Sequence, residues 1–210
     1  MEVGAMKTVA GPSAIEWATA ARTLGGESVS GDLHVVADFP GGALVGVVDG
    51  LGHGPEAALA AEAAVAMLER DAGASVGTLI ATCHEGLRRT RGVVMSLASI
   101  SSVANTVSWA GIGDVEAVLL RTENTGRRRE SIILRGGVVG YQLPPVRETT
   151  LPIGRGDVLI FCTDGVRADF ISEVANDREP QAIADDVLAR YAKSTDDALV
   201  MVVRYRGALA

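Results

Sequence analysis

Aspartates at the ends of apolar runs constrain the fold of this chain more than any other feature. Asp49 and Asp164 each directly follow an apolar run, and Asp196 stands just before another. The runs are 43–48, 158–163 and 198–203. Runs of this length, rich in β-branched residues, predict buried strands. A carboxylate at the end of a buried strand is costly unless a positive group meets it.

A fourth aspartate, Asp32, follows Ser30 and Gly31 and opens a further strand-like stretch. Three or four carboxylates that converge at one place cannot all stay ionised by themselves. Oxygen ligands suit hard divalent cations such as Mg²⁺ and Mn²⁺. The four aspartates together therefore predict a site for divalent cations.

The order of the expected elements indicates an α+β fold. Strands are expected at 15–21, 32–39, 43–48, 93–101, 105–110, 115–121, 131–134, 158–163 and 198–205, and helices at 55–71, 75–89 and 181–193. Strands and helices segregated in this way predict antiparallel sheets covered by helices. The sequence contains no linker, repeat or low-complexity segment, so one domain is expected over residues 1–210.

Composition and charge exclude some classes of partner. The net charge of −7 disfavours nucleic acid. No segment reaches the roughly 20 apolar residues of a membrane helix, and no signal peptide pattern opens the chain. Cys83 and Cys162 lie inside apolar patterns, which is typical of buried thiols in a reducing compartment. We therefore expect a cytoplasmic protein.

Three ordered motifs resemble a known enzyme family. They are Asp49-Gly50-Leu51-Gly52-His53-Gly54, Thr163-Asp164-Gly165 and the pair Asp196-Asp197 ahead of a strand. This combination resembles the PPM-type (type-2C) metal-dependent serine/threonine protein phosphatases, in particular their SpoIIE-like branch. The resemblance extends from about Gly31 to Val203. The segment 137–144 is similar to the RsbX-like phosphatases of the stressosome.

The resemblance implies a four-layer α/β/β/α sandwich of two antiparallel sheets, with two Mn²⁺ or Mg²⁺ ions at one end. Asp49 would bridge both ions. The Gly50 carbonyl would be a ligand of the second ion, directly or through water, and Asp32 would lie near that ion. Asp164 and Asp196 would hold the first ion. Asp49, Asp164 and Asp196 would thus be catalytic through water activated by the ions.

Two roles are open for each of three further residues near these motifs. Asp114 matches the place of a third metal ion in many type-2C enzymes, but an aspartate between two strands is also a common turn residue. His53 would donate a proton or only occupy a turn at the start of a helix. Asp197 would face solvent or act as a secondary ligand.

The expected activity is removal of phosphate from serine or threonine of a regulatory phosphoprotein. The resemblance implies a phosphorylated STAS-domain protein of a stressosome or anti-sigma pathway as the partner. Two alternatives remain: a degenerate phosphatase fold that only binds a phosphoprotein, and a hydrolase of small phosphoesters. The basic run 127–129 is either a solvated loop or a docking element for an acidic partner.

Overall fold

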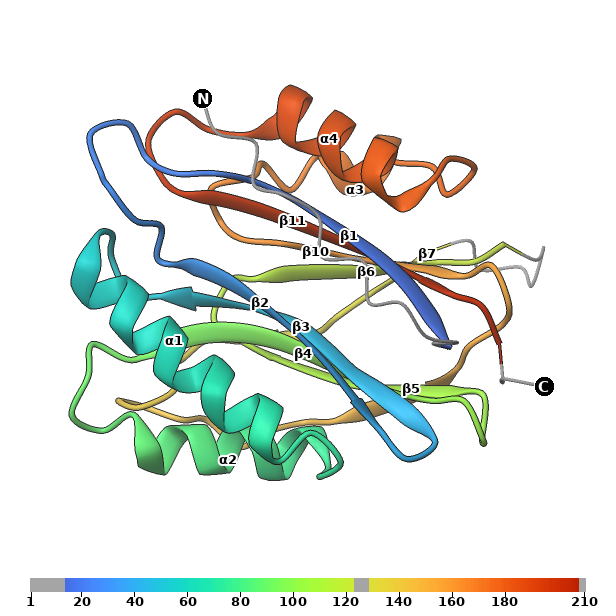
Figure 1. Ribbon diagram of the computed structural model, residues 1–210, viewed down its shortest axis with the longest axis horizontal. Helices are drawn as coiled ribbons and strands as arrows, with labels where there is room; N and C mark the ends of the chain where they lie inside the picture. The colour runs from blue at the N-terminus through green and yellow to red at the C-terminus, as the bar shows by residue number, and fades with distance from the viewer. Residues whose placement is uncertain (1–13, 123–128, 208–210) are drawn as a thin grey trace.

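Two β-sheets face each other and carry helices on their outer sides (Figure 1). The structure, a computed structural model, describes residues 14–122 and 129–207. The first sheet has the strand order β1 (Ile15–Arg22), β11 (Ala198–Tyr205), β10 (Val158–Cys162), β6 (Glu116–Leu120) and β7 (Arg129–Ser131). The second sheet has the order β2 (Asp32–Phe39), β3 (Gly42–Gly50), β4 (Val93–Ser101), β5 (Thr106–Ile112) and β8 (Leu134–Arg135), and β9 (Thr149–Pro152) also pairs with β5.

Helices complete the outer layers. The helices α1 (Pro55–Arg70) and α2 (Val76–Gly86) cover the second sheet, and α3 (Phe170–Glu173) and α4 (Pro180–Tyr191) cover the first. Strand pairs are antiparallel except for the short parallel pair of β5 and β8. The expected α+β sandwich with α/β/β/α layers is therefore confirmed. No helix among the described residues is long and apolar enough to cross a bilayer.

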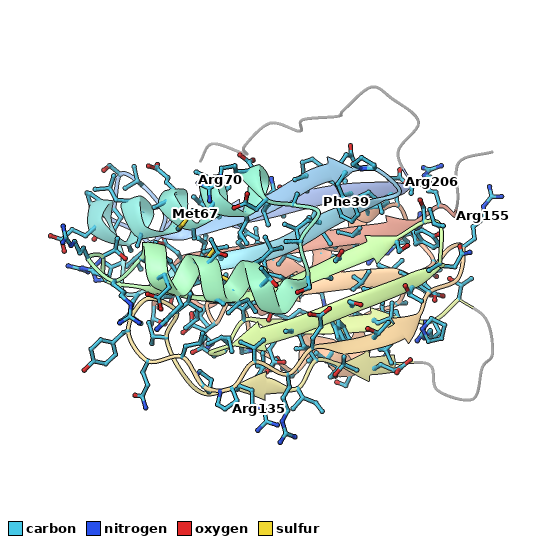
Figure 2. The ribbon with its side chains drawn as sticks, turned by 90° about the horizontal axis from the view of Figure 1, so that it is seen from below. Phe39, Met67, Arg70, Arg135, Arg155 and Arg206 are labelled. Carbon is cyan, nitrogen blue, oxygen red and sulfur yellow. The ribbon has the colours of Figure 1, made fainter. Side chains whose placement is uncertain are left out.

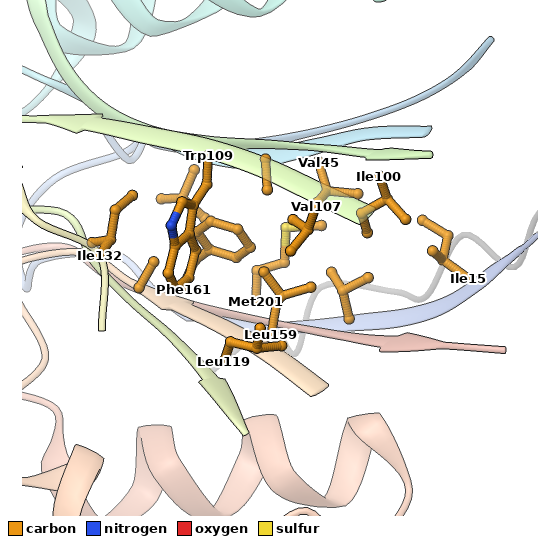
Figure 3. Packing of buried hydrophobic residues seen from close by; sticks show 14 of the residues in the cluster. Ile15, Val45, Ile100, Val107, Trp109, Leu119, Ile132, Leu159, Phe161 and Met201 are labelled. Carbon is orange, nitrogen blue, oxygen red and sulfur yellow. The ribbon is translucent and has the colours of Figure 1, made fainter. Parts of the chain in front are cut away.

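The main core lies between the sheets. Trp109 of the second sheet packs with Phe161 and Met201 of the first (Figure 3). Outside the second sheet, small alanines on the buried face of α1 allow the helix to lie close to the strands. Figure 2 shows α1 and α2 side by side over this sheet. A Cβ added at Gly86 of α2 would lie 2.5 Å from Met67 Sδ of α1, so the two helices are in close contact.

The prediction of a strand at 131–134 is wrong. The chain instead crosses from one sheet to the other here: β7 ends at Ser131 in the first sheet, and β8 begins at Leu134 in the second. Ile132 is buried between the sheets, whereas Ile133 is 70% exposed. An apolar run at a crossover resembles a strand, because sequence periodicity does not report which sheet each residue joins.

The helix expected over 75–89 is shorter than predicted. Ser75 is its N-cap and accepts a hydrogen bond from Thr78 N, and the helix ends at Gly86. The Thr90 hydroxyl donates to the Leu87 carbonyl at 2.8 Å, which closes a turn directly after the helix. Arg88 and Arg89 therefore lie beyond the last helical turn. The strand β9 and the short helix α3 were not predicted. The residues Glu-Asn-Thr-Gly at 123–126 are typical of a turn, and they lie outside the described residues.

Candidate metal centre

Asp32 and Asp49 face each other across the second sheet. Asp32 opens β2, Asp49 lies one residue before the end of β3, and the register of the two strands pairs them directly. Directly opposed like charges on neighbouring strands destabilise a sheet. The sequence thus places two carboxylates where their mutual repulsion needs a counter-charge.

The first sheet brings Asp164 and Asp196 to the same end of the sandwich. Asp164 lies two residues after β10, and Asp196 lies two residues before β11. These strands are antiparallel neighbours in which Cys162 pairs with Val200. In Figure 1 this end of both sheets lies at the left of the view, where the loop from β1 to β2 and the start of α1 also lie.

Asp114 belongs to the same neighbourhood. It is exposed and lies in the turn between β5 and β6, where the chain passes from the second sheet to the first. Its negative charge contributes to the raised pKa of Asp49 and of Asp164. The structure therefore places Asp114 near the other four aspartates, in a turn.

Burial and mutual repulsion make these carboxylates hard to ionise. Burial raises the pKa of Asp49 to about 9, and the charges of Asp32 and Asp164 add to the effect. Burial likewise raises the pKa of Asp32 to about 7, against the opposing hydrogen bond from Thr163. The pKa of Asp164 is also raised, first by burial and then by neighbouring aspartates, while Lys193 lowers it. At neutral pH such a cluster binds either protons or cations.

The donor set fits hard divalent ions. No side chain of the described residues donates a hydrogen bond to the Asp49 carboxylate, which leaves its oxygens available. As the side chains lie, no three His, Cys, Asp or Glu groups within residues 14–122 and 129–207 are spaced as ligands of one ion. Mg²⁺ is typically held by only one or two carboxylates and keeps several waters. The aspartates therefore suit ions that complete their coordination with water.

Close packing explains two of the glycines at this site. A Cβ on Gly50 would overlap the Ala57 carbonyl in the first turn of α1. A Cβ on Gly31 would lie 2.9 Å from Ala57 Cβ and 3.3 Å from the Gly50 carbonyl oxygen. The absence of side chains lets the start of α1 approach the ends of β2 and β3.

The expectation that Asp197 faces solvent is wrong. Asp197 is buried, and its two carboxylate oxygens accept hydrogen bonds from Leu24 N at 2.7 Å and Gly31 N at 2.8 Å. Both atoms belong to the segment between β1 and β2 that leads into Asp32. Asp197 therefore fixes the backbone that positions Asp32.

His53 takes part in a contact between two loops. Its Nδ1 lies 2.6 Å from Glu27 Oε1, and the imidazole is exposed. Glu27 lies in the segment between β1 and β2, and His53 lies in the glycine-rich loop after β3. This geometry favours a role in the loop before α1 over a role as a proton donor.

One surface cavity lies away from the aspartates. It has a volume of about 540 Å³ and lies at the edges of the two sheets, between β5, β7 and β9. Trp109, Glu130 and Leu151 are among its lining residues, and none of the five aspartates is. The carboxylate cluster therefore lies apart from this cavity.

Comparison with known proteins agrees with this geometry. Residues 40–206 match the family of Stage II sporulation protein E (SpoIIE). The chain belongs to this family. The match to the SpoIIE family begins directly after β2 and covers β3, the helices α1 to α4 and every later strand, so it includes Asp49, Asp164 and Asp196 but not Asp32. The comparison with curated protein sequences gave no match.

Solved structures confirm the SpoIIE-type fold. A chain of the bacterial stressosome, a modular system adapted to control secondary messenger signalling, is 26% identical with a TM-score of 0.82, and the match covers 90% of this chain and 99% of that one. RsbX in complex with magnesium is 20% identical with a TM-score of 0.80, covering 90% and 94%. The phosphatase domain of SpoIIE from Bacillus subtilis, with a regulatory fragment, is 22% identical with a TM-score of 0.77, covering 93% and 64%. The chain is thus a PPM-type serine/threonine protein phosphatase of a metal-dependent family.

Thr163 is a functional residue that the motif contained but sequence reasoning did not single out. Its buried hydroxyl donates to Asp32 Oδ2 at 2.7 Å and accepts from Leu199 N at 2.9 Å. Asp32 belongs to the second sheet, whereas Thr163 and Leu199 belong to the first. Thr163 therefore orients one carboxylate oxygen of Asp32 and joins the two sheets beside the site.

Replacing Thr163 with valine should weaken metal binding, because valine keeps the volume but cannot donate to Asp32. Loss of such an outer hydrogen bond typically costs about 10–100-fold in metal affinity. Calorimetric titration of Mn²⁺ into the metal-free protein measures the effect. Thr163→Ser keeps the hydroxyl and should restore the affinity. Equal affinities for the valine variant and the wild type would show that Thr163 has only a packing role.

Proposed function

We propose that this chain acts as one phosphatase domain that removes phosphate from serine or threonine of a regulatory phosphoprotein. A phosphorylated STAS-domain protein of a stressosome or anti-sigma pathway is the proposed substrate. One observation carries the proposal. In a chain of the SpoIIE family, Asp32 and Asp49 of one sheet meet Asp164 and Asp196 of the other at one end of the sandwich.

The proposed ligand set follows this arrangement. Asp49 pairs directly with Asp32 in the sheet register, and its pKa is also raised by the charges of Asp164, Asp114 and Asp196. It is therefore the best candidate to bridge two ions, with Asp164 and Asp196 on one side and Asp32 and the Gly50 carbonyl on the other. Asp114 is the candidate for a third ion. Mg²⁺ and Mn²⁺ both suit these oxygen donors.

The chain's own residues prepare the site for a phosphate. Divalent ions, when bound, polarise phosphoryl oxygens and make water a better nucleophile near neutral pH. Thr163 and Asp197 hold Asp32 and its backbone in place. Lys193 donates to the Asp164 carbonyl and brings a positive charge to the edge of the cluster. These contacts hold the carboxylates in place before the substrate binds. The site then needs less rearrangement during the reaction, which lowers the activation free energy.

Relatives in stress signalling support the proposed substrate class. The similar structures include a stressosome chain and RsbX, and a further one contains the RsbU and RsbW domains of Rv1364c from Mycobacterium tuberculosis. The last is 18% identical with a TM-score of 0.73. A metal site at one end of a single domain contacts little of a short peptide. Specificity is therefore expected to come from contacts with a folded partner.

Purified protein should hydrolyse an aryl phosphate in the presence of Mn²⁺ and should lose this activity when a chelator removes the ions. The expected loss is about 100-fold or more, because the ions supply several kcal/mol of charge stabilisation. The same preparation should release phosphate from a phosphorylated STAS-domain protein. Full activity after exhaustive chelation, with no residual metal by elemental analysis, would refute the metal-dependent mechanism. Activity on aryl phosphate alone would favour a small-molecule phosphoesterase.

A further inference from the structure

A rigid turn lies close to the candidate metal centre. Val139 exchanges two backbone hydrogen bonds with Val93 at the start of β4, at 2.9 and 2.8 Å. Val138 and Gln142 exchange two more, both at 2.9 Å. These contacts fix the turn 138–142 on the end of the second sheet. In Figure 1 the gold segment that follows β8 lies beside the green loop between α2 and β4, at the same end as the metal centre.

The middle of this turn is fixed from a second direction. Gly140 N donates to His84 Nδ1 of α2 at 3.0 Å. A Cβ on Gly140 would lie 2.9 Å from Leu87 Cβ, and its φ of 98° favours glycine. The backbone of residue 140 is thus held against the end of α2, and the following residue has little conformational freedom.

Tyr141 projects from this turn without packing on the protein. It is 82% exposed, more than any other large hydrophobic residue that the structure describes. Its backbone N–H donates to Val138 at 3.1 Å, while no contact of its ring or hydroxyl appears among the described residues. A tyrosine that stabilises nothing in the folded chain, on a backbone fixed by several hydrogen bonds, is preorganised for a contact with another molecule.

Leu51 and Arg91 extend this surface to the aspartates. Leu51 directly follows Gly50, is 46% exposed, and donates from its N–H to the Gly92 carbonyl at 3.1 Å. The Arg91 guanidinium lies against Gly52 and forms an ion pair with Glu56 at 2.5 Å. Leu51, Arg91 and Tyr141, here called the Tyr141 ridge, are exposed at the same end of the sandwich, and Leu51 is one residue from the candidate site.

We propose that the Tyr141 ridge is the docking surface for the folded phosphoprotein substrate, an inference that rests on the proposed function. Tyrosine and arginine are enriched among the residues that dominate binding energy at interfaces. The nearby arginines are largely neutralised in a chain of net charge −7: Arg88 pairs with Glu85 and Arg91 with Glu56, and only Arg89 forms no ion pair among the described residues. The ridge lies at the same end of the sandwich as the candidate metal centre, so a molecule docked on it can present a phosphate to the aspartates, which favours the phosphoprotein over a second copy of this chain.

The alternative docking element, the run 127–129, has less support. Arg127 and Arg128 lie outside the described residues. The Arg129 guanidinium donates to the carbonyl oxygens of Ser172 and Val174, so it holds β7 to the segment around α3. Arg129, the only arginine of this run that the structure describes, therefore has a role within the fold.

Kinetics on two substrates test the docking surface. Tyr141→Ala should raise the KM for a serine-phosphorylated STAS-domain protein about tenfold or more, as loss of an interface anchor does. Turnover of 4-nitrophenyl phosphate should not change, because Tyr141 contacts none of the five aspartates. Val103→Ala is the matched control: Val103 is 81% exposed, but it lies after β4 at the opposite end of the sandwich. An unchanged KM for the phosphoprotein would overturn the proposal, and so would an equal loss on both substrates.

Calorimetry separates this proposal from the proposed function. The same phosphoprotein is titrated into Asp49→Ala and into the double variant Asp49→Ala/Tyr141→Ala. Weaker binding by the double variant would support docking on the Tyr141 ridge. Absence of turnover by the wild type would contradict only the proposed phosphatase activity and would leave the docking proposal standing. Equal dissociation constants for the single and the double variant would contradict docking on the Tyr141 ridge. Sedimentation of the wild type and Tyr141→Ala provides the last check, because a dimer that dissociates in the variant would make a second copy the occupant.

Discussion

Replacing Asp49 with alanine is expected to reduce phosphatase activity by roughly a thousandfold or more, the largest loss among the aspartate variants. The charges of Asp32, Asp114, Asp164 and Asp196 all raise the pKa of Asp49, and we propose Asp49 as the bridge between two ions. Loss of several kcal/mol of charge stabilisation in the transition state corresponds to about three powers of ten in rate. Steady-state hydrolysis of an aryl phosphate over a range of Mn²⁺ concentrations measures the effect.

Asp164→Ala and Asp196→Ala provide the comparison for this result. Each should lose activity through weaker binding of a single ion, so higher Mn²⁺ should partly restore both variants but not Asp49→Ala. Urea denaturation of each variant checks that the fold is kept. Near wild-type turnover by Asp49→Ala on any phosphoprotein would show that the bridging ligand is misassigned.

Gly165→Ala should destabilise the protein by about 3 kcal/mol or more, because overpacking against fixed backbone is relieved only by moving it. A Cβ at this position would overlap the backbone carbonyl of Asp197 and crowd Ala198 Cα. The displaced residues directly follow Asp196 and include the carboxylate that holds Leu24 and Gly31. Urea-induced unfolding measures the loss, and Mn²⁺ affinity should fall in parallel.

Gly25→Ala is the matched control for this substitution. A Cβ on Gly25 meets no atom within 4 Å, and its φ lies outside the range that favours glycine. Its stability should therefore remain within about 0.5 kcal/mol of the wild type. A Gly165→Ala variant as stable as Gly25→Ala would contradict the packing described around Asp197.

Much of the fold and the position of the aspartates could be predicted from the sequence. The strands leading to Asp49 and Asp164 are buried on both sides, so they appear as continuous apolar runs with clear ends. Turn residues such as Gly41 mark the hairpin that pairs Asp32 with Asp49. Local patterns of this kind identify which residues share an end of a sheet.

Contacts between distant segments could not be predicted in the same way. Asp197 accepts its hydrogen bonds from residues 173 and 166 positions away, and nothing in its local sequence distinguishes it from a solvated aspartate. The hydroxyl of Thr163 reaches Asp32 across 131 positions. The crossover at Ile132 was missed because joining two sheets leaves no periodic pattern. The ligand roles of Asp32, Asp49, Gly50, Asp114, Asp164 and Asp196 remain predictions.

The division of the aspartates between the sheets has a mechanical consequence. Two of them belong to each sheet, so ions that bind all four would also cross-link the two halves of the sandwich. Ion binding would then stabilise one relative position of the two sheets. By linkage, that same position of the sheets would raise the affinity for the ions. Any partner that shifts one sheet against the other would change ion affinity without touching an aspartate. The core between the sheets contains Trp109, Phe161 and Met201. Changes in its packing would thus alter ion affinity, and with it the reaction rate, as well as stability.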